Sequence, residues 1–184
     1  VFGNLDEESG AGVAATRDGA TGASKPVGRY MVNAQACETE DGLQLFRDLH
    51  EMPREKSASW EKIFAQLLDS MRGLEQHYKH PQEIEFTVEK GKLWILQTLP
   101  ARRSGRAAVR WAVEMATGQD AATGKPLPRI LKAEEALQMI SVADFEQMLF
   151  PLFEVEAEKK AIMVQKGVPL APGAASGRLL LFDD

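Results

Sequence analysis

Hydrophobic and polar residues alternate over residues 83–98, which read EIEFTVEKGKLWILQT. A period of two is typical of half-buried β-strands, and Lys90-Gly91, which separates the two runs, has the chemistry of a tight turn. The pattern therefore predicts a β-hairpin with one dry face and one wet face.

Two polar residues of this hairpin suggest more than contact with water. Glu85 lies centrally in the first strand between two apolar neighbours, and Gln97 lies late in the second. If the strands pair about the turn, both side chains project into one region, where their oxygens suit a cation such as magnesium. On spacing alone, a solvated hairpin face is the favoured interpretation of both residues.

Helical periodicity is clearest over residues 57–80. Apolar residues recur there at spacings of three and four, which indicates one broad stripe packed on a core. The stripe comprises Trp60, Ile63, Phe64, Leu67, Leu68, Met71, Leu74 and Tyr78. His77 and His80 close the segment and, without a recognisable third ligand, are interpreted as cations that favour a helix C-terminus.

Five further elements are expected around this helix and hairpin. The pattern predicts strands over residues 12–17 and 29–35, a small-residue helix within residues 100–118, and short helices over residues 133–140 and 142–149. These segments alternate with loops rich in glycine and proline.

Four arginines gather at the start of the small-residue helix. Positive charge opposes the helix dipole at that end, so the cluster calls for an anionic partner, either a carboxylate or a phosphate. A neighbouring carboxylate is the favoured partner. The four are Arg102, Arg103, Arg106 and Arg110.

Composition narrows the class of protein. The 184 residues are 44% hydrophobic and 27% charged, which suits one folded domain or two small units. The net charge of −5, with both signs mixed, argues against a nucleic-acid surface, and no apolar run is long enough to cross a membrane. The single cysteine, Cys37, excludes an internal disulfide and fits a cytoplasmic protein. Because the sequence starts at Val1 without a methionine and stops after the strand-like RLLLF, a piece of a longer protein is expected.

Several phrases, taken together, resemble one family. In chain order they are VFGN, SGAGVAATRDGATG, GRYMVNAQ, EIEFTVEKGKLWILQT, RRSGRAAVRWAVEM and KGVPLAPGAASGRLLLF. They occur in the order found in pyruvate, phosphate dikinases and run nearly end to end. The related phosphoenolpyruvate synthases typically read IEW and QARP at the hairpin, so IEFT and LQT favour the dikinase branch.

The resemblance implies an α+β fold and a division of the chain. Residues 1–101 would be the later part of an ATP-grasp nucleotide-binding domain, an antiparallel sheet with packed helices. Residues 102–160 would be a helical connector, and residues 161–184 the start of a swivelling phosphohistidine domain. The family interconverts ATP, phosphate and pyruvate with AMP, diphosphate and phosphoenolpyruvate through a phosphohistidine. A cytoplasmic, homodimeric whole enzyme without nucleic-acid or membrane partners is the corresponding expectation.

Site residues are carried over from the same resemblance. Glu85 matches the carboxylate that holds magnesium at the ATP phosphates, Gln97 matches its companion on the second strand, and Glu83 matches an acidic residue near the nucleotide. The implied cofactors are Mg²⁺ and ATP. Residues on stiff strands suit phosphoryl transfer, which depends on positioning and charge neutralisation.

The chain also departs from the family pattern. Leu99 stands where the family has an arginine that contacts the phosphates, although Arg102 or Arg103 could replace that cation. Arg29 stands where the family has an acidic residue, and residues 36–40, ACETE, replace GEDVV.

Two hypotheses follow for function. In the first, the chain is part of a dikinase-like phosphotransferase and is inactive alone, because the acceptor histidine would lie beyond its last residue and no catalytic residue is assigned within it. In the second, the chain is a degenerate dikinase relative with a structural or regulatory interaction role. The first is the leading hypothesis, and the departures at Leu99, Arg29 and residues 36–40 are the features that favour the second.

Overall fold

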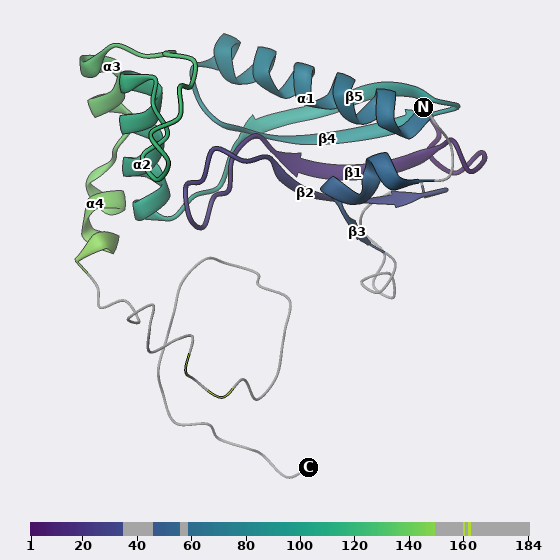
Figure 1. The fold of residues 1–184 in the computed structure, drawn as a ribbon, viewed down its shortest axis with the longest axis horizontal. Coiled ribbons are helices and arrows are strands. Elements are labelled where there is room, and N and C mark those ends of the chain that lie inside the picture. The colour runs from purple at the N-terminus through teal and green to yellow at the C-terminus, as the bar shows by residue number, and fades with distance from the viewer. Residues whose placement is uncertain (35–45, 56–58, 150–159, 161, 163–184) are drawn as a thin grey trace.

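The computed structural model describes residues 1–34, 46–55, 59–149, 160 and 162. These residues form a five-stranded sheet with a long helix along it, and three shorter helices stand at one end of the sheet (Figure 1). An antiparallel sheet with packed helices is an α+β fold, as the sequence predicted. No described helix is long and apolar enough to cross a bilayer.

The strands are arranged in the order β3-β2-β1-β4-β5, and every neighbouring pair is antiparallel. Their bounds are β1 Gly10–Ala15, β2 Val27–Val32, β3 Arg47–Asp48, β4 Gln82–Glu89 and β5 Lys92–Pro100. The two predicted N-terminal strands are confirmed, but each begins two residues earlier than expected. The short strand β3 was not predicted.

The predicted hairpin is confirmed as β4 and β5. Lys90 and Gly91 both have positive φ, 47° and 71°, which matches the turn that joins two right-twisted strands most easily. Glu89 lies opposite Lys92 at the turn. The register shifts between Glu85 and Phe86, so that Leu96 is the extra residue of a β-bulge in β5.

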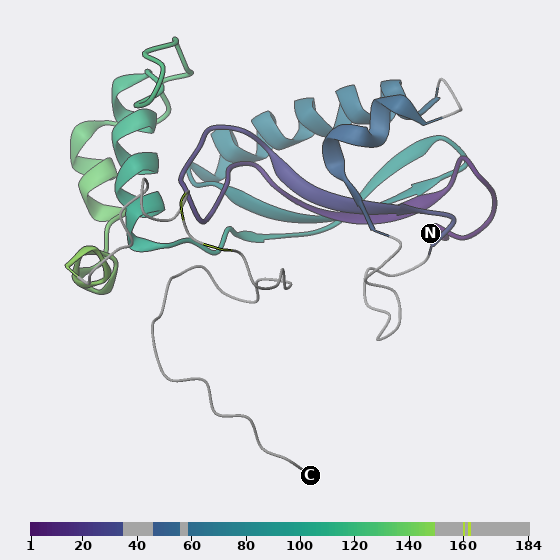
Figure 2. The same cartoon turned by 60° about the horizontal axis from the view of Figure 1, so that its bottom comes forward.

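One face of the sheet is covered by helices. Helix α1, Ser59–Tyr78, and the 3₁₀ helix η1, Leu49–Arg54, lie on that face, and none of the described helices lies on the other (Figure 2). We call this second side of the sheet the open face. Helix η1 contains Pro53 and was not predicted.

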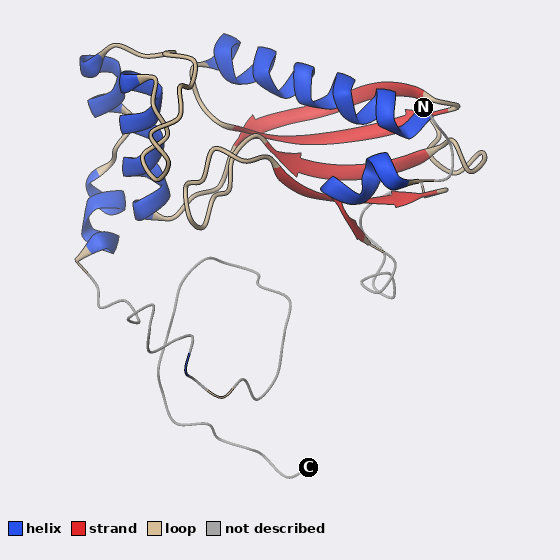
Figure 3. Cartoon of the chain, in the orientation of Figure 1, coloured by secondary structure: helices blue, strands red, loops and turns tan. Residues whose placement is uncertain are grey.

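The three remaining helices form a separate unit beside the sheet (Figure 3). They are α2 Gly105–Thr117, α3 Ala133–Gln138 and α4 Val142–Met148, which confirms the three predicted helices. The Ser104 side chain accepts the Ala107 amide at the start of α2. The phrase at residues 166–182 lies outside the described residues, so the expected last strand is not described.

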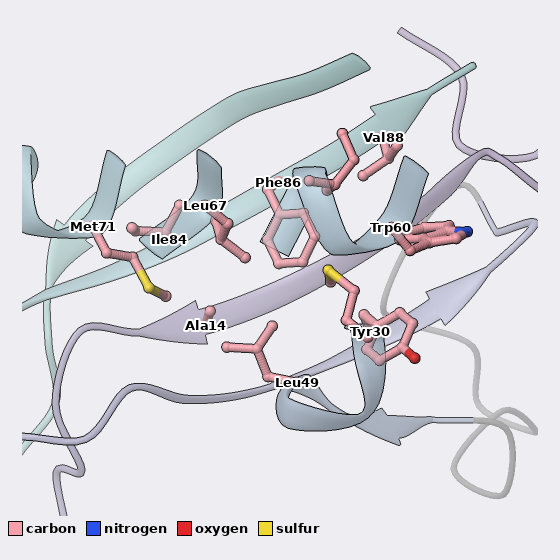
Figure 4. Close-up of a cluster of buried hydrophobic side chains, with 11 residues drawn as sticks. Ala14, Tyr30, Leu49, Trp60, Leu67, Met71, Ile84, Phe86 and Val88 are labelled. Carbon is pink, nitrogen blue, oxygen red and sulfur yellow. The ribbon is translucent and has the colours of Figure 1, made fainter. Parts of the chain in front are cut away.

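The main core lies between α1 and the sheet (Figure 4). The predicted stripe of α1 packs against β4, β2 and η1, which confirms its role as core except for Tyr78, which is 50% exposed. The largest buried side chains there are Trp60, Ile63, Leu67, Met71, Tyr30, Leu49, Met52, Ile84, Phe86 and Val88, all at most 1% exposed. Burial of each such apolar side chain contributes about 1.5–3 kcal/mol, so this contact stabilises the sheet's helical face.

A buried ion network connects the sheet to the helical unit. Arg17, just after β1, donates from Nη2 to Glu75 Oε1 on α1 at 2.7 Å and from Nη1 to Glu114 Oε2 on α2 at 2.9 Å. Glu114 Oε1 also accepts from Arg110 Nε at 2.7 Å and from the Ala121 amide at 3.0 Å. Since removal of one partner leaves an unpaired buried charge, the network holds β1, α1 and α2 in one arrangement.

Candidate functional site

Strand β4 presents its acidic side chains on the open face. Ile84, Phe86 and Val88 point into the core beneath α1 (Figure 4), so alternation directs Glu83 and Glu85 to the opposite side. Glu85 is exposed, and Glu83 is partly buried. The core pattern of the strand therefore determines where both carboxylates lie.

Glu85 and Gln97 lie directly opposite each other in the register of β4 and β5. Side chains at such positions share a face, with Cβ atoms about 4.5–5.5 Å apart. Neither side chain makes a hydrogen bond or ion pair with another described residue. The structure thus brings these two predicted site residues together and leaves their oxygens available within the described part of the chain.

The row of residues that contains this pair crosses the whole sheet. Asp48 of β3 lies opposite Arg29 of β2, Arg29 opposite Val13 of β1, and Val13 opposite Glu85. The sequence identified Arg29 only as a departure from a family pattern. Its place in the row of Glu85 depends on the pairing of β1 with both β2 and β4, for which the sequence gives no signal.

Glu83 lies two residues before Glu85 in β4, on the same face of the sheet and opposite Leu99. Its Oε1 atom is 3.5 Å from Arg102 Nη2, and the Arg102 side chain is 85% exposed. Exposed ion pairs contribute about 0–1 kcal/mol, so Arg102 can exchange this carboxylate for another anion at little cost.

Arg103, in contrast, forms hydrogen bonds with residues outside the hairpin. Its Nη2 donates to the Met139 carbonyl at 2.7 Å and to Asp144 Oδ2 at 3.0 Å, while Nη1 donates to His80 Nε2 at 2.7 Å. Of Arg102 and Arg103, only Arg102 lies beside Glu83 with an exposed head group.

The predicted carboxylate partners of the arginine cluster are confirmed for three of its members. Arg102 pairs with Glu83, Arg103 with Asp144, and Arg110 with Glu114. Arg106 forms no ion pair with a described residue.

The interpretation of the two histidines as residues at the helix C-terminus fits the position of only one of them. His77 lies in the last turn of α1, where a cation favours the dipole. His80 lies beyond the helix, donates from Nδ1 to the Pro81 carbonyl at 2.7 Å and accepts from Arg103 at Nε2, so it is a neutral acceptor. Burial lowers the pKa of His80, and the positive charge of Arg103 acts in the same direction.

A pre-formed metal cage is absent from the described residues. No group of three or more His, Cys, Asp or Glu side chains there could hold a metal ion. A cavity of about 280 Å³ lies between α1, the β1–β2 loop and residues 127–130, and it includes none of Glu83, Glu85 and Gln97. Within the described part of the chain, a cation held by the Glu85–Gln97 pair would therefore lack a third acidic or imidazole ligand.

Comparison with known proteins defines the class first: residues 27–119 match the family model described as the AMP/ATP-binding domain of pyruvate phosphate dikinase. This match includes α1, the hairpin, α2 and Arg29. The chain belongs to this family, as the resemblance of its phrases predicted.

The relatives found are themselves dikinases. The chain is 35% identical to pyruvate, phosphate dikinase of Rhizobium meliloti (strain 1021) over all of its length, and 35% identical to the chloroplastic pyruvate, phosphate dikinase 1 of Arabidopsis thaliana over 98% of its length. Pyruvate, phosphate dikinase 2 of Zea mays is 34% identical over 98% of the chain. The chain spans only 20%, 17% and 19% of these three relatives, so it corresponds to about a fifth of such a protein.

Proposed function

We propose that the chain contributes magnesium and phosphate ligands to the nucleotide site of a pyruvate, phosphate dikinase-like phosphotransferase. Glu85 and Gln97 would bind Mg²⁺, and Glu83 would lie near the nucleotide. The proposal rests on one observation above all: in an AMP/ATP-binding domain, these two exposed residues lie side by side without other partners among the residues that the structure describes.

The chemistry of magnesium fits such a pair. Mg²⁺ usually keeps several waters and binds one or two protein oxygens together with substrate phosphates. The ATP phosphates would supply the missing ligands, and the ion would offset charge that develops during transfer. Arg102, next to Leu99 and Glu83, would supply a mobile positive charge in place of the family's arginine.

In the whole protein, the phosphoryl group would pass from ATP to a histidine of a phosphohistidine domain and then to pyruvate. The division into a partial ATP-grasp domain, a helical connector and the start of the phosphohistidine domain belongs to the same proposal. So do a cytoplasmic location and a homodimeric whole enzyme. The 184-residue chain alone is expected to bind nucleotide weakly and to catalyse no turnover.

A structural or regulatory interaction role is the second candidate. The observation that favours it is the apolar surface of β5, an edge strand, where Trp94, Leu96 and Leu99 are 36%, 50% and 53% exposed. Exposed apolar surface of this kind is typical of contact with another protein or domain.

Titration calorimetry with Mg-ATP distinguishes the two candidates. We expect weak but measurable binding to the chain, and a loss of about ten- to a hundredfold in affinity in Glu85→Ala, as for removal of a metal-site ligand. Glu61→Ala removes an exposed carboxylate from α1, on the covered face, and serves as the matched control. Absence of binding, or equal affinities of the two variants, would remove the nucleotide proposal and leave the interaction role.

A further inference from the structure

We propose that Arg29 is a phosphate ligand of this site, and that a bound polyphosphate crosses β1 above Val13 between Arg29 and the Glu85–Gln97 pair. The inference rests on the proposed function and extends it to a residue on a different strand. It gives the site a fixed positive charge at one end and a cation-binding pair at the other.

The sheet places Arg29 on the open face. Its neighbour Tyr30 is fully buried in the core, so alternation turns Arg29 to the other side, together with Glu85. Only Val13 stands between them in the row. With neighbouring strands about 4.8 Å apart, the backbones of β2 and β4 are about 10 Å apart at this point. A long arginine side chain on β2 and a metal held from β4 and β5 can therefore approach the same polyphosphate.

Val13, the residue between Arg29 and Glu85, has a small apolar side chain. Val13 is partly exposed and offers no charge or hydrogen-bond donor of its own. A phosphate above it would thus depend for its charge neutralisation on the groups on either side of Val13, which are Arg29 and the proposed Mg²⁺. This arrangement gives Arg29 a direct electrostatic function in binding.

The Arg29 guanidinium keeps its donors available. Its central carbon lies over the Phe46 ring, 4.7 Å from the ring centroid, a contact that uses none of its hydrogen bonds. No described residue accepts a hydrogen bond from its N–H groups. Asp48, opposite Arg29 in β3, accepts the His50 amide at 2.8 Å and forms no ion pair with Arg29. The in-plane N–H groups can therefore bind a phosphate through two parallel hydrogen bonds.

The test compares Arg29→Gln with Arg72→Gln in the 184-residue chain. Both substitutions remove one exposed positive charge, but Arg72 lies on α1, where it pairs with Asp69. We titrate each variant and the unchanged chain with Mg-ATP and with magnesium tripolyphosphate. Arg29→Gln is expected to weaken both ligands by about tenfold, as for the loss of a charge-assisted hydrogen bond, and Arg72→Gln to leave both unchanged.

A second variant tests whether a loss of affinity in Arg29→Gln comes from loss of folding. Arg29→Lys keeps the positive charge but loses the paired donors, so we expect a smaller loss of affinity than in Arg29→Gln, with an unchanged melting temperature. Folding of each variant is checked by its circular dichroism spectrum.

The outcomes separate the inference from the proposed function. If the unchanged chain binds Mg-ATP and Glu85→Ala weakens binding, but Arg29→Gln behaves like Arg72→Gln, the role of Arg29 is wrong and the nucleotide site stands. If the unchanged chain does not bind Mg-ATP, or Glu85→Ala has no effect, the proposed function fails and the role of Arg29 fails with it.

Discussion

His80 shows how one residue's environment decides its charge. The neutral ring accepts a hydrogen bond from Arg103 Nη1, and Arg103 in turn holds Asp144 on α4. A protonated ring would present a donor to a guanidinium, so this contact requires the neutral form. The single residue thus joins the end of α1 to the helical unit only while it stays uncharged.

This arrangement predicts a pH dependence of stability. Because the folded-state pKa of His80 is lowered from its ordinary 6.5, its contribution is fully present above pH 6.5 and is lost as pH falls through the lowered value. The urea-unfolding free energy should therefore fall from about pH 7.5 to about pH 5 in the unchanged chain, and less so in His80→Gln.

His77→Gln is the control for this measurement, since His77 is exposed at the end of α1. It should show a fall at least as large as that of the unchanged chain, because it keeps His80 and its contact with Arg103. The lowered pKa values of Asp18, Asp120, Asp144 and Glu135 start from ordinary values of 3.8 and 4.5, act mostly below this range, and are common to the unchanged chain and both histidine variants. An identical fall in His80→Gln would contradict the account of His80.

At the residue scale, the sequence predicted the features that depend on the spacing of neighbouring residues. Period two and one turn were enough to predict the hairpin, but an unbroken register would place Leu96 opposite Glu85, and only the bulge at Leu96 brings Gln97 to that position. The neutral state of His80 depends on Arg103, 23 residues away, and the row of Arg29 depends on two strand pairings. Neither leaves a trace in local spacing, which is why both were missed.

Two turns of the chain share the pattern Asp-x-Ala-Thr-Gly and a conformation. Residues 18–22, DGATG, and residues 120–124, DAATG, each begin with an aspartate whose Oδ1 accepts the amides two and three residues on. In each turn the closing glycine amide donates to the aspartate carbonyl at 2.8 Å. Ser24 Oγ, after the first turn, donates to Asp120 Oδ2 of the second at 2.9 Å. The hydrogen bonds of the turn, led by the Thr123 amide, lower the pKa of Asp120 to about 2.

The closing glycines of these turns form a natural pair for mutation. Both have positive φ, 76° at Gly22 and 67° at Gly124. A Cβ at Gly22 would lie 2.9 Å from Arg110 Cβ and 3.0 Å from Ala107 Cα on α2, whereas a Cβ at Gly124 meets nothing within 4 Å. We expect Gly124→Ala to cost about 1–2 kcal/mol of backbone strain, and Gly22→Ala at least about 1 kcal/mol more.

Urea unfolding of the two alanine variants checks this expectation. Equal losses of unfolding free energy would mean that the first turn does not pack against α2 as described. A larger loss in Gly124→Ala would contradict it outright.

At the element scale, long periodic segments were predictable and short ones were not. Helix α1 and the hairpin have strong periods and clear ends, and the three later helices follow from their apolar spacing. Strand β3 has two residues and η1 contains a proline, so neither shows a period. The bulge at Leu96 depends on pairing with β4, which the β5 sequence alone does not reveal.

At the scale of the whole molecule, β1 is the element that assembles the candidate site. It lies between β2 and β4, although 66 residues separate its end from the start of β4. This order carries Arg29 and the Glu85–Gln97 pair to one face, while α1 and η1 occupy the other. The sequence predicted the class of fold but not this order, because strand order depends on which edges meet and not on the period of any strand.

Manganese-induced broadening of amide NMR signals tests the central claim most directly, since Mn²⁺ prefers the same oxygen ligands as Mg²⁺. With ATP present, small amounts of Mn²⁺ should first broaden the amides around Glu85 on β4 and Gln97 on β5, and should spare α3 and α4. In Glu85→Ala, this local broadening should disappear. Broadening centred elsewhere on the chain, or a pattern that Glu85→Ala leaves unchanged, would contradict a nucleotide-bound cation on the open face.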